Sequence, residues 1–271
     1  MTDTKISLPL RSVSQLNQYC ACPQAYKLAR IDKVWVRPAA WLPQGTAFHT
    51  VAETYEKRRN EGNPMTLDEA MDLFKAEYSK DVGALTEETP NFEWWFWSGP
   101  YNGQRDVERR WEIGLEQVEK FIEWRETEGQ EIWTTPDGTP AIELYFEIEL
   151  EGIIVRGYID AVVVVDGKLR VRDYKTGNKP GDDFQLGVYA LALRMLYGVE
   201  VTEGDYFMVG KKGKKPKPTP VYDLTPWTYE EVRDRFHEVE EGIAAGRFDP
   251  DPDPDKCGFC DVNYSCPVFR D

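Results

Sequence analysis

The chain of 271 residues is poor in basic residues and histidine and has no long apolar run. Its 33 lysines and arginines stand against 48 aspartates and glutamates, a net charge of −15 at pH 7, so any basic surface for nucleic acid must be local. No stretch approaches the roughly 20 apolar residues of a membrane span, and residues 1–10 lack a signal-peptide core. We therefore expect a soluble cytoplasmic protein without a membrane partner.

Two further absences narrow the chemistry. The chain has no G-x-x-x-x-G-K-[ST] phosphate-binding motif, and the lysine run after Gly210 does not fit one. A nucleotide-driven motor of that type is thus excluded from this chain. Cysteine is scarce, with five residues, and an odd number in a chain without a signal peptide argues against disulfides. A metal or a metal cluster is the alternative use of such cysteines.

A predicted β-hairpin carries the first group of candidate residues. Residues 162–165 are β-branched and end at Asp166-Gly167, a dipeptide typical of two-residue hairpin turns. Residues 169–174 then alternate as a returning strand does. A two-residue turn pairs Val165 with Lys168, and this pair fixes the register of both strands.

Three charged side chains share one face of this hairpin. In that register Asp160 lies opposite Asp173, and Lys175 follows on the same face because side chains repeat every second residue. The second strand's other basic residues point to the opposite side, which we expect to be wet: Lys168, Arg170 and Arg172. Opposed carboxylates destabilise a sheet unless a cation lies between them, and Mg²⁺ or Mn²⁺ prefers such oxygen ligands. The residues alone leave a plain salt bridge from Asp160 to Arg156 or Lys175 as the alternative.

The motif continues beyond the hairpin. The run Asp160, Asp173-Tyr174-Lys175-Thr176-Gly177 and Gln185-x-x-x-Tyr189 resembles the PD-(D/E)XK nuclease superfamily in its RecB exonuclease branch. The resemblance implies a Mg²⁺ or Mn²⁺ ion held by Asp160, Asp173 and the backbone carbonyl of Tyr174. It also implies that Lys175 orients or deprotonates the attacking water. The pair Gln185 and Tyr189, four apart on a predicted helix over residues 185–196, would support the active site and substrate.

A histidine is a further candidate ligand. Residues 45–60 predict a helix, on which His49 and Glu53 share a face. A lone histidine is ordinarily a core or helix-surface residue. The family carries a histidine in a helix before the two strands, so the resemblance implies that His49 ligates the catalytic metal.

A third strand brings two more acidic residues into consideration. Residues 141–150 alternate strictly, and a turn at Glu151-Gly152 pairs Leu150 with Ile153 and places Glu143 opposite Asp160. Glu143 or Glu147 could thereby join the metal site. Ordinary exposed strand residues have the same pattern, and we favour that interpretation for both glutamates.

The cysteines lie near the two ends of the chain. Residues 12–26 match the family's N-terminal pattern S-x-S-x-L-x-x-Y-x-x-C-P-x-x-Y, which implies Cys22 as a cluster ligand, with Cys20 as its rival. Cys257, Cys260 and Cys266 follow a stiff DPDPDPD spacer. Four thiolates suit a [4Fe–4S] cluster, and a zinc ion takes the same ligands. CRISPR-associated and AddB-like relatives have one N-terminal and three C-terminal cysteines, so the resemblance implies the [4Fe–4S] cluster, which would join the two segments.

Two basic runs and one aromatic run are candidate DNA contacts. Within residues 211–217 these are Lys211, Lys212, Lys214 and Lys215, although a solvated loop has the same composition. The second basic run comprises Lys27, Arg30, Lys33 and Arg37. Residues 91–97, NFEWWFW, hold three tryptophans on which bases could stack, at about 1–3 kcal/mol each. An aromatic core cluster is the ordinary alternative for this run and the one we favour.

The remaining segments complete the predicted architecture. Further helices are predicted over residues 66–79, 103–128 and 226–245, and a strand over residues 204–209. The fold class is α/β, a PD-(D/E)XK restriction-endonuclease-like core whose central mixed sheet is flanked by helices. We expect a single RecB-like nuclease domain over residues 1–271. It would contain a helical insertion at 60–135 and a cysteine-rich, cluster-binding segment at 247–271.

These residues and the resemblance predict a stand-alone, metal-dependent DNA exonuclease of a bacterial, archaeal or phage-infected cell, acting in recombination, repair or CRISPR-type DNA processing. Relatives often degrade single strands from the 5′ end, so the resemblance implies that substrate and polarity. One alternative is a non-catalytic, cluster-stabilised DNA-binding subunit that acts with a partner helicase or integrase. The intact set Asp160, Asp173 and Lys175 argues against it. A zinc-stapled endonuclease is another alternative.

Overall fold

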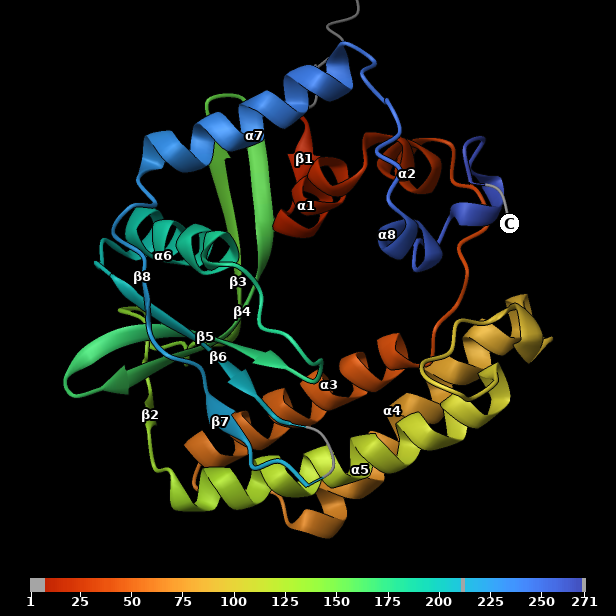
Figure 1. Cartoon of the computed structure of the whole chain (residues 1–271). Helices are drawn as coiled ribbons and strands as arrows, with labels where there is room; N and C mark the ends of the chain where they lie inside the picture. The colour runs from red at the N-terminus through yellow and green to blue at the C-terminus, as the bar shows by residue number, and fades with distance from the viewer. Residues whose placement is uncertain (1–7, 211–212, 270–271) are drawn as a thin grey trace, which may run out of the picture.

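The computed structural model describes residues 8–210 and 213–269 of the chain (Figure 1). Its strands are β1 (Leu10–Arg11), β2 (Glu131–Ile132), β3 (Ile142–Leu150), β4 (Ile153–Val165), β5 (Lys168–Lys175), β6 (Glu203–Met208), β7 (Lys217–Pro218) and β8 (Tyr222–Asp223). Its main helices are α1 (Val13–Ala21), α3 (Trp41–Asn60), α4 (Leu67–Glu88), α5 (Gly103–Thr127), α6 (Asp183–Tyr197) and α7 (Tyr229–Ala244). Shorter helical segments are α2 (Pro23–Tyr26), η1 (Lys27–Ile31), η2 (Phe92–Trp94), α8 (Pro254–Gly258) and η3 (Asn263–Ser265).

The long strand β4 organises one mixed sheet. Its first half lies between antiparallel β3 and parallel β1, and its second half between antiparallel β5 and β2. Strand β6 runs parallel to β5, and helix α6 connects the two, as a parallel crossover requires. Strands β7 and β8 both pair with β6. A central mixed sheet with flanking helices is the predicted fold class.

Both predicted hairpin turns have the geometry that fixes register. Asp166 and Gly167 have φ values of 51° and 74°, and Glu151 and Gly152 have 46° and 93°. Two successive positive φ values are typical of the type I′ turn, whose twist matches that of the flanking strands. Val165 accordingly pairs with Lys168, and Leu150 with Ile153. The predicted registers of both hairpins are confirmed.

Helices cover both faces of the sheet, so each face has its own core. Helices α1, α6 and α7 bury one face, where Leu186 and Tyr189 lie in one apolar cluster with Val162 and Val171. Helices α3, α4 and α5 bury the other, as Figure 1 shows below the sheet. There the ring of Phe121 lies 5.4–6.1 Å from four other rings. Each large apolar side chain buried in this way contributes about 1.5–3 kcal/mol.

The expectation that the outer basic residues of β5 face water is wrong for Arg172, which is only 1% exposed. Its guanidinium pairs with both carboxylate oxygens of Asp205 on β6, at 2.7 and 2.8 Å, and lies 5.3 Å from the ring of Trp124 on α5. Arg170 pairs with Glu203 at 2.6 Å. Helix α5 covers this face, so basic residues there are paired inside the protein. Lys168 alone of the three is exposed.

Most predicted elements occur, with shifted ends. Helix α3 begins at Trp41, four residues before the predicted start, because Pro43 is tolerated in a first turn whose N–H groups lack helical partners. Helix α4 begins with the predicted capping box of Thr66 and Glu69 but extends to Glu88. Helix α5 is part of the second core, since the rings of Trp124 and Phe207 lie 4.0 Å apart. The description of residues 60–135 as an insertion stays a prediction.

Candidate metal centre and cysteine pocket

Asp160 and Asp173 lie where the β4–β5 ladder ends. The paired residues stop at Ala161 and Arg172, so the two aspartates are the next residue of each strand. Oδ2 of Asp160 accepts a 2.7 Å hydrogen bond from the backbone N–H of Tyr174. Both aspartates are buried. The hairpin therefore holds two carboxylates in one apolar place, as its register predicts.

Helix α3 brings His49 to this end of the hairpin. Its Nδ1 atom lies 3.5 Å from Oδ2 of Asp160 and 3.5 Å from Oε1 of Glu143 on β3. One ligand atom from each of these three residues lies within 4.8 Å of the other two. The three residues line a pocket of about 530 Å³ together with Glu53 and Thr176. Two sheet strands and one helix thus contribute one compact group of donor atoms.

Glu143 stands out because its backbone is strained. Its φ is +44°, in the left-handed region that non-glycine residues rarely adopt, and it is missing from the ladder between the Ile142 and Leu144 pairs. Such a conformation costs about 1–3 kcal/mol and occurs preferentially at functional sites. The expectation of an ordinary exposed strand residue is wrong for Glu143, which is half-buried and whose donor atom lies with those of His49 and Asp160. Glu147 instead is exposed and accepts a hydrogen bond from Tyr145.

The pKa values of the cluster residues are shifted so that the group retains protons when no cation is bound. Burial, reinforced by the charge of Asp173, raises the pKa of Asp160 to about 8. Burial likewise raises the pKa of Asp173, against the opposing effect of Lys175. For His49, burial alone lowers the pKa, but the neighbouring carboxylates, chiefly Asp160, raise it to about 9. Without a cation the group retains protons, and a divalent cation can replace them.

Lys175 and the α6 pair form a chain of polar contacts beside the carboxylates. Nζ of Lys175 lies 2.7 Å from Oδ2 of Asp173 and 3.5 Å from Oε1 of Gln185. The amide of Gln185 in turn donates to the hydroxyl of Tyr189 at 2.7 Å. Tyr189 is buried against Phe146, so its hydroxyl is held in place. The structure brings together these three residues, which the sequence names for this site.

Tyr174 has a different place from its neighbours. Its ring lies in the second core, where its hydroxyl donates to the buried carboxylate of Glu56 at 3.3 Å. Glu56 also pairs with Arg125 at 2.5 Å. The side chain therefore anchors β5 to α3 and α5. The backbone carbonyl of Tyr174 as a metal ligand stays a prediction.

The donor set fits a divalent cation. Carboxylate oxygens are the preferred ligands of Mg²⁺ and Mn²⁺, and an imidazole nitrogen is also accepted by Mn²⁺ and later transition metals. His49, Glu143 and Asp160 would hold the ion directly. Asp173 is beside them but does not belong to the compact group. The predicted set of His49, Asp160, Asp173 and Tyr174 omits Glu143, whose donor atom the structure places with those of His49 and Asp160.

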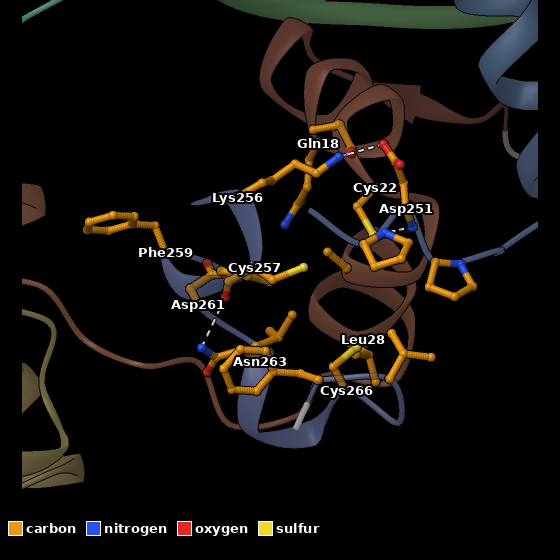
Figure 2. Close-up of a pocket in the computed structure, with 18 residues that line it drawn as sticks. Gln18, Cys22, Leu28, Asp251, Lys256, Cys257, Phe259, Asp261, Asn263 and Cys266 are labelled. Atoms are coloured by element: carbon orange, nitrogen blue, oxygen red, sulfur yellow. Dashed lines mark hydrogen bonds and ion pairs between the residues drawn. The ribbon is translucent and has the colours of Figure 1, made fainter. Parts of the chain in front are cut away.

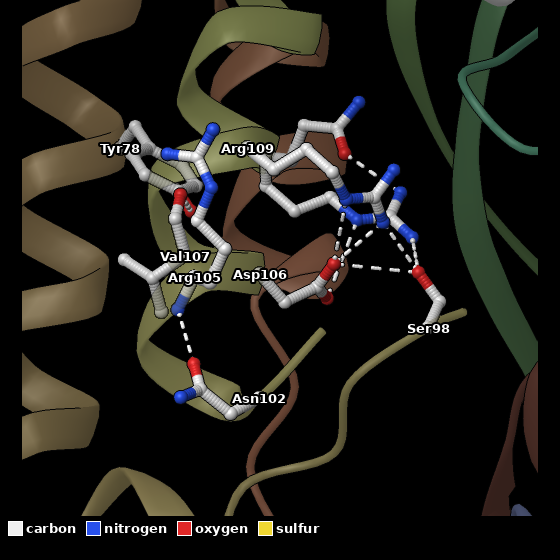
Figure 3. A network of polar contacts seen from close by, with 9 residues as sticks. Tyr78, Ser98, Asn102, Arg105, Asp106, Val107 and Arg109 are labelled. Atoms are coloured by element: carbon white, nitrogen blue, oxygen red, sulfur yellow. Dashed lines mark hydrogen bonds and ion pairs between the residues drawn. The ribbon is translucent and has the colours of Figure 1, made fainter. Parts of the chain in front are cut away.

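A buried polar network supports the pocket from the side of α5. The amide of Gln117 donates to the backbone carbonyls of Thr176 and Gly210, at 3.0 and 3.2 Å, and accepts from Gln44 at 2.5 Å. Gln44 accepts from Arg110 at 3.1 Å. Figure 3 shows the far end of this network. There Ser98 and the buried carboxylate of Asp106 are engaged by arginines of α5: Arg109 and Arg110.

The four predicted cluster cysteines line one pocket of about 200 Å³ between the N- and C-terminal segments: Cys22, Cys257, Cys260 and Cys266. Figure 2 shows Cys22 facing Cys257 and Cys266 across this space. Backbone N–H groups of Asp251 and Asp253 approach Sγ of Cys22 and Cys257 at 3.5 Å. Cys20 is exposed and does not line the pocket.

The spacing of the sulfurs bears on which group they fit. Among the described residues, no three cysteine sulfurs lie within 4.8 Å of one another. A tetrahedral zinc ion with Zn–S bonds of about 2.3 Å requires sulfurs about 3.8 Å apart. The described cysteines therefore do not form a closed tetrahedral site as they stand, and the [4Fe–4S] cluster stays a prediction.

Residues 11–267 match the family model of the PD-(D/E)XK nuclease superfamily. The chain belongs to this superfamily. A relative called "Gene 69 protein" of Mycobacterium phage D29 is 76% identical over 268 residues, 98% of this chain and 100% of the relative. The "Gene 69 protein" of Mycobacterium phage L5 is 69% identical over 290 residues, the whole of both chains. The solved structure titled "Crystal structure of SSO0001" covers 97% of this chain and 87% of its own at 12% identity, with a weak TM-score of 0.41.

The residues of the two basic runs, which are candidate DNA contacts, differ in their exposure and in their partners within the chain. Lys214 and Lys215 are exposed, whereas Lys211 and Lys212 lie outside the described residues. In the second basic run, Lys27 pairs with Asp32 and Arg30 binds Gln18. These two side chains have partners within the chain. No helix in the described part of the chain is long and apolar enough to cross a membrane.

The tryptophan run is divided between core and surface. Trp95 and Phe96 are buried, and Nε1 of Trp95 donates to the carbonyl of Thr89 at 2.8 Å. Trp94 and Trp97 are exposed. The core-cluster prediction is therefore right for two of these residues and wrong for two.

Proposed function

We propose that the protein is a metal-dependent deoxyribonuclease that degrades single-stranded DNA from an end. One observation supports this proposal above the others. In a member of the PD-(D/E)XK nuclease superfamily, donor atoms of His49, Glu143 and Asp160 lie within 4.8 Å of one another, beside Asp173 and Lys175. Single-strand preference, exonuclease action and 5′-to-3′ polarity come from the resemblance to RecB-type relatives.

Each residue has a defined part in this proposal. His49, Glu143 and Asp160 hold the cation, which when bound stabilises negative charge that develops on the phosphate oxygens. Asp173 holds the ammonium of Lys175, which is placed by Gln185 to orient the attacking water and to bind the scissile phosphate. Tyr189 fixes Gln185 and thereby the direction of the lysine side chain.

The four pocket cysteines are proposed to hold a [4Fe–4S] cluster with a structural role. Their common lining of one pocket supports a bound metal group, and the resemblance to RecB-type relatives favours a cluster over zinc. The ligands come from residue 22 and from residues 257–266, so the cluster would close a loop of more than 230 residues. A cluster at this place would link the first helices to the C-terminal segment without touching the metal pocket.

The charge of the chain favours a second arrangement, in which a partner delivers the DNA. A net charge of −15 repels nucleic acid at long range and slows encounter with a free strand. A helicase or recombination protein that hands over a strand would remove this barrier. In its extreme form the chain would be a DNA-binding subunit without catalysis of its own.

Cleavage of end-labelled linear and circular single-stranded DNA by anaerobically purified protein in Mn²⁺ tests the proposal. We expect wild type to degrade the linear strand alone. Asp173→Ala and Lys175→Ala should lose at least about 100-fold in rate, since Lys175 acts on the attacking water and Asp173 holds its ammonium in place. Glu147→Ala, an exposed glutamate on β3, is the matched control and should retain wild-type activity. Cleavage of circles would point to an endonuclease, and absence of cleavage with DNA binding retained would point to the non-catalytic subunit.

A further inference from the structure

Aromatic side chains from three parts of the chain meet between the metal pocket and the cysteine pocket. We call this set the aromatic track: Trp41, Trp94, Phe96, Trp97, Phe259 and Tyr264. It begins at the metal pocket, which Trp41 and Leu42 line together with His49 and Asp160. It ends on the cysteine-rich segment, where Phe259 lies between Cys257 and Cys260 in sequence. No part of the proposed catalytic machinery uses these rings.

The rings follow one another at contact distance. The centroid of Trp41 lies 5.9 Å from that of Phe96, and Phe96 is stacked on Phe259 at 6.4 Å with planes 26° apart. Trp94 and Tyr264 lie 6.1 Å apart. These spacings fall in the range of favourable aromatic pairs. The run of residues 91–97 and the cysteine-rich segment thus form one aromatic surface that reaches the metal pocket.

Arg37 holds this surface together. Its guanidinium carbon lies 4.2 Å from the ring of Phe96, 5.6 Å from Trp97 and 5.3 Å from Tyr264. The same side chain donates to the carbonyls of Trp94 and Trp95, and the backbone N–H of Arg37 donates to the backbone carbonyl of Asp261 at 2.7 Å. The arginine therefore fixes the ring orientations and places one cation among them.

The outer rings of the track are open to solvent. Phe259 is 67% exposed, Tyr264 55%, Trp94 53% and Trp97 39%. Figure 2 shows the Phe259 ring extending away from the cysteines rather than into their pocket. Large exposed aromatic surface next to a functional pocket marks a binding site, because water is a poor solvent for it.

We propose that the aromatic track binds the bases of single-stranded DNA and leads the strand to the metal centre. This inference rests on the proposed nuclease function and adds how the substrate is bound. Every base has an aromatic face, so stacking on such rings accepts any sequence. A chain of net charge −15 gains little from phosphate contacts, and stacking is the source of affinity that depends least on a basic surface.

The test is DNA binding without divalent cation, so that no cleavage occurs. A fluorescent oligothymidine of about 20 nucleotides is titrated with wild type, with Phe259→Leu and Trp97→Leu, and with the double variant. Leucine keeps the apolar bulk and removes the ring. We expect about 10-fold weaker binding for the double variant, because each stacked base contributes a few-fold or more. Leu196→Ala, an exposed apolar residue on α6, is the matched control and should bind as wild type does.

A second probe needs no variant. An oligonucleotide of equal length whose central nucleotides are abasic keeps the phosphates and lacks the bases. Wild type should bind it about as weakly as the double variant binds the intact strand, and the salt dependence of intact-strand binding should be shallow. Equal affinity for intact and abasic strands would overturn the track and leave the nuclease proposal standing. Failure of wild type to bind any single strand would overturn both.

Discussion

At the scale of single residues, Glu143 combines strain with position. Its left-handed backbone conformation costs about 1–3 kcal/mol of folding free energy. In exchange its carboxylate lies 3.5 Å from Nδ1 of His49, on the side of the ring that also faces Asp160. A residue that is unfavourable for folding and well placed for a cation is better explained by function than by stability.

Replacement of Glu143 should separate these two properties. Glycine adopts positive φ without strain, so we expect Glu143→Gly to raise the melting temperature of the metal-free protein by about 2–4 °C. The same variant should bind Mn²⁺ at least 10-fold more weakly by calorimetric titration, since one carboxylate ligand is lost. A lower melting temperature together with unchanged Mn²⁺ affinity would show that Glu143 is a structural residue.

The raised pKa values of Asp160 and His49 should make the metal-free protein less stable at alkaline pH. The pKa of Asp160 is raised to about 8 from its ordinary value near 4, and that of His49 to about 9 from 6.5. For each group, between its ordinary pKa and its raised pKa, the folded state binds more protons than the unfolded state. The free energy of unfolding therefore falls as pH rises through that range. We expect the melting temperature in EDTA to decrease from pH 6 to pH 9. Asp160→Asn should flatten this decrease, and a rising melting temperature over the same range would contradict the assignment.

At the scale of elements, α5 reaches the site through Gln117. This side chain is buried and holds two carbonyls, one at Thr176 directly after Lys175 and one at Gly210 after β6. The ends of two neighbouring parallel strands are thereby tied to a helix that contributes no metal ligand. Positioning of Lys175 depends on this tie as well as on the hairpin.

Gln117→Leu should lower the cleavage rate by a larger factor than it lowers the affinity for Mn²⁺. Leucine has similar volume, but it leaves the carbonyls of Thr176 and Gly210 without their donor, at a cost of about 1–3 kcal/mol of stability. We expect about a 10-fold lower rate with an unchanged Mn²⁺ titration. Glu123→Ala, an exposed residue on the same helix, should leave both quantities unaltered. A Mn²⁺ affinity that falls in proportion to the rate would mean that Gln117 acts on the metal ligands instead.

At the scale of the whole molecule, the cysteine pocket joins the two ends of the chain. Cys22 follows α1, and the other three cysteines follow the spacer after α7, yet all line the same cavity (Figure 2). The C-terminal segment also carries Phe259 and Tyr264, so the same junction positions part of the aromatic track. If the proposed cluster joins these segments, its loss should disturb the proposed DNA binding as well as stability.

The pair Cys22 and Cys20 provides a matched test of this junction. Cys22→Ser should lower the iron content of anaerobically purified protein and its melting temperature by more than about 5 °C, because a metal group that binds only the folded state contributes to folding. Cys20→Ser should match wild type in both. Zinc rather than iron in the wild-type protein would replace the proposed cluster, and equal behaviour of the two variants would remove Cys22 from the ligand set.

Local rules account for what the sequence predicts well. Turn chemistry at Asp166-Gly167 and Glu151-Gly152 and strict alternation fix two registers, and these place Asp160 and Asp173 at the same end of one hairpin. The motif from Asp160 to Tyr189 and the spacing of the C-terminal cysteines can each be recognised within a short stretch of chain. Each depends on residues within a few positions of one another, where backbone geometry leaves little choice.

The sequence by itself thus determined the fold class, both hairpins and the residues of the central motif. Only the tertiary structure decided that Glu143 rather than Glu147 meets His49, that Arg172 is buried, and that the tryptophan run is divided between core and surface. The physical reason is that these outcomes depend on which helix covers which face of the sheet. A residue's exposure and its partners across that interface are set by packing between distant segments, and no local pattern encodes them.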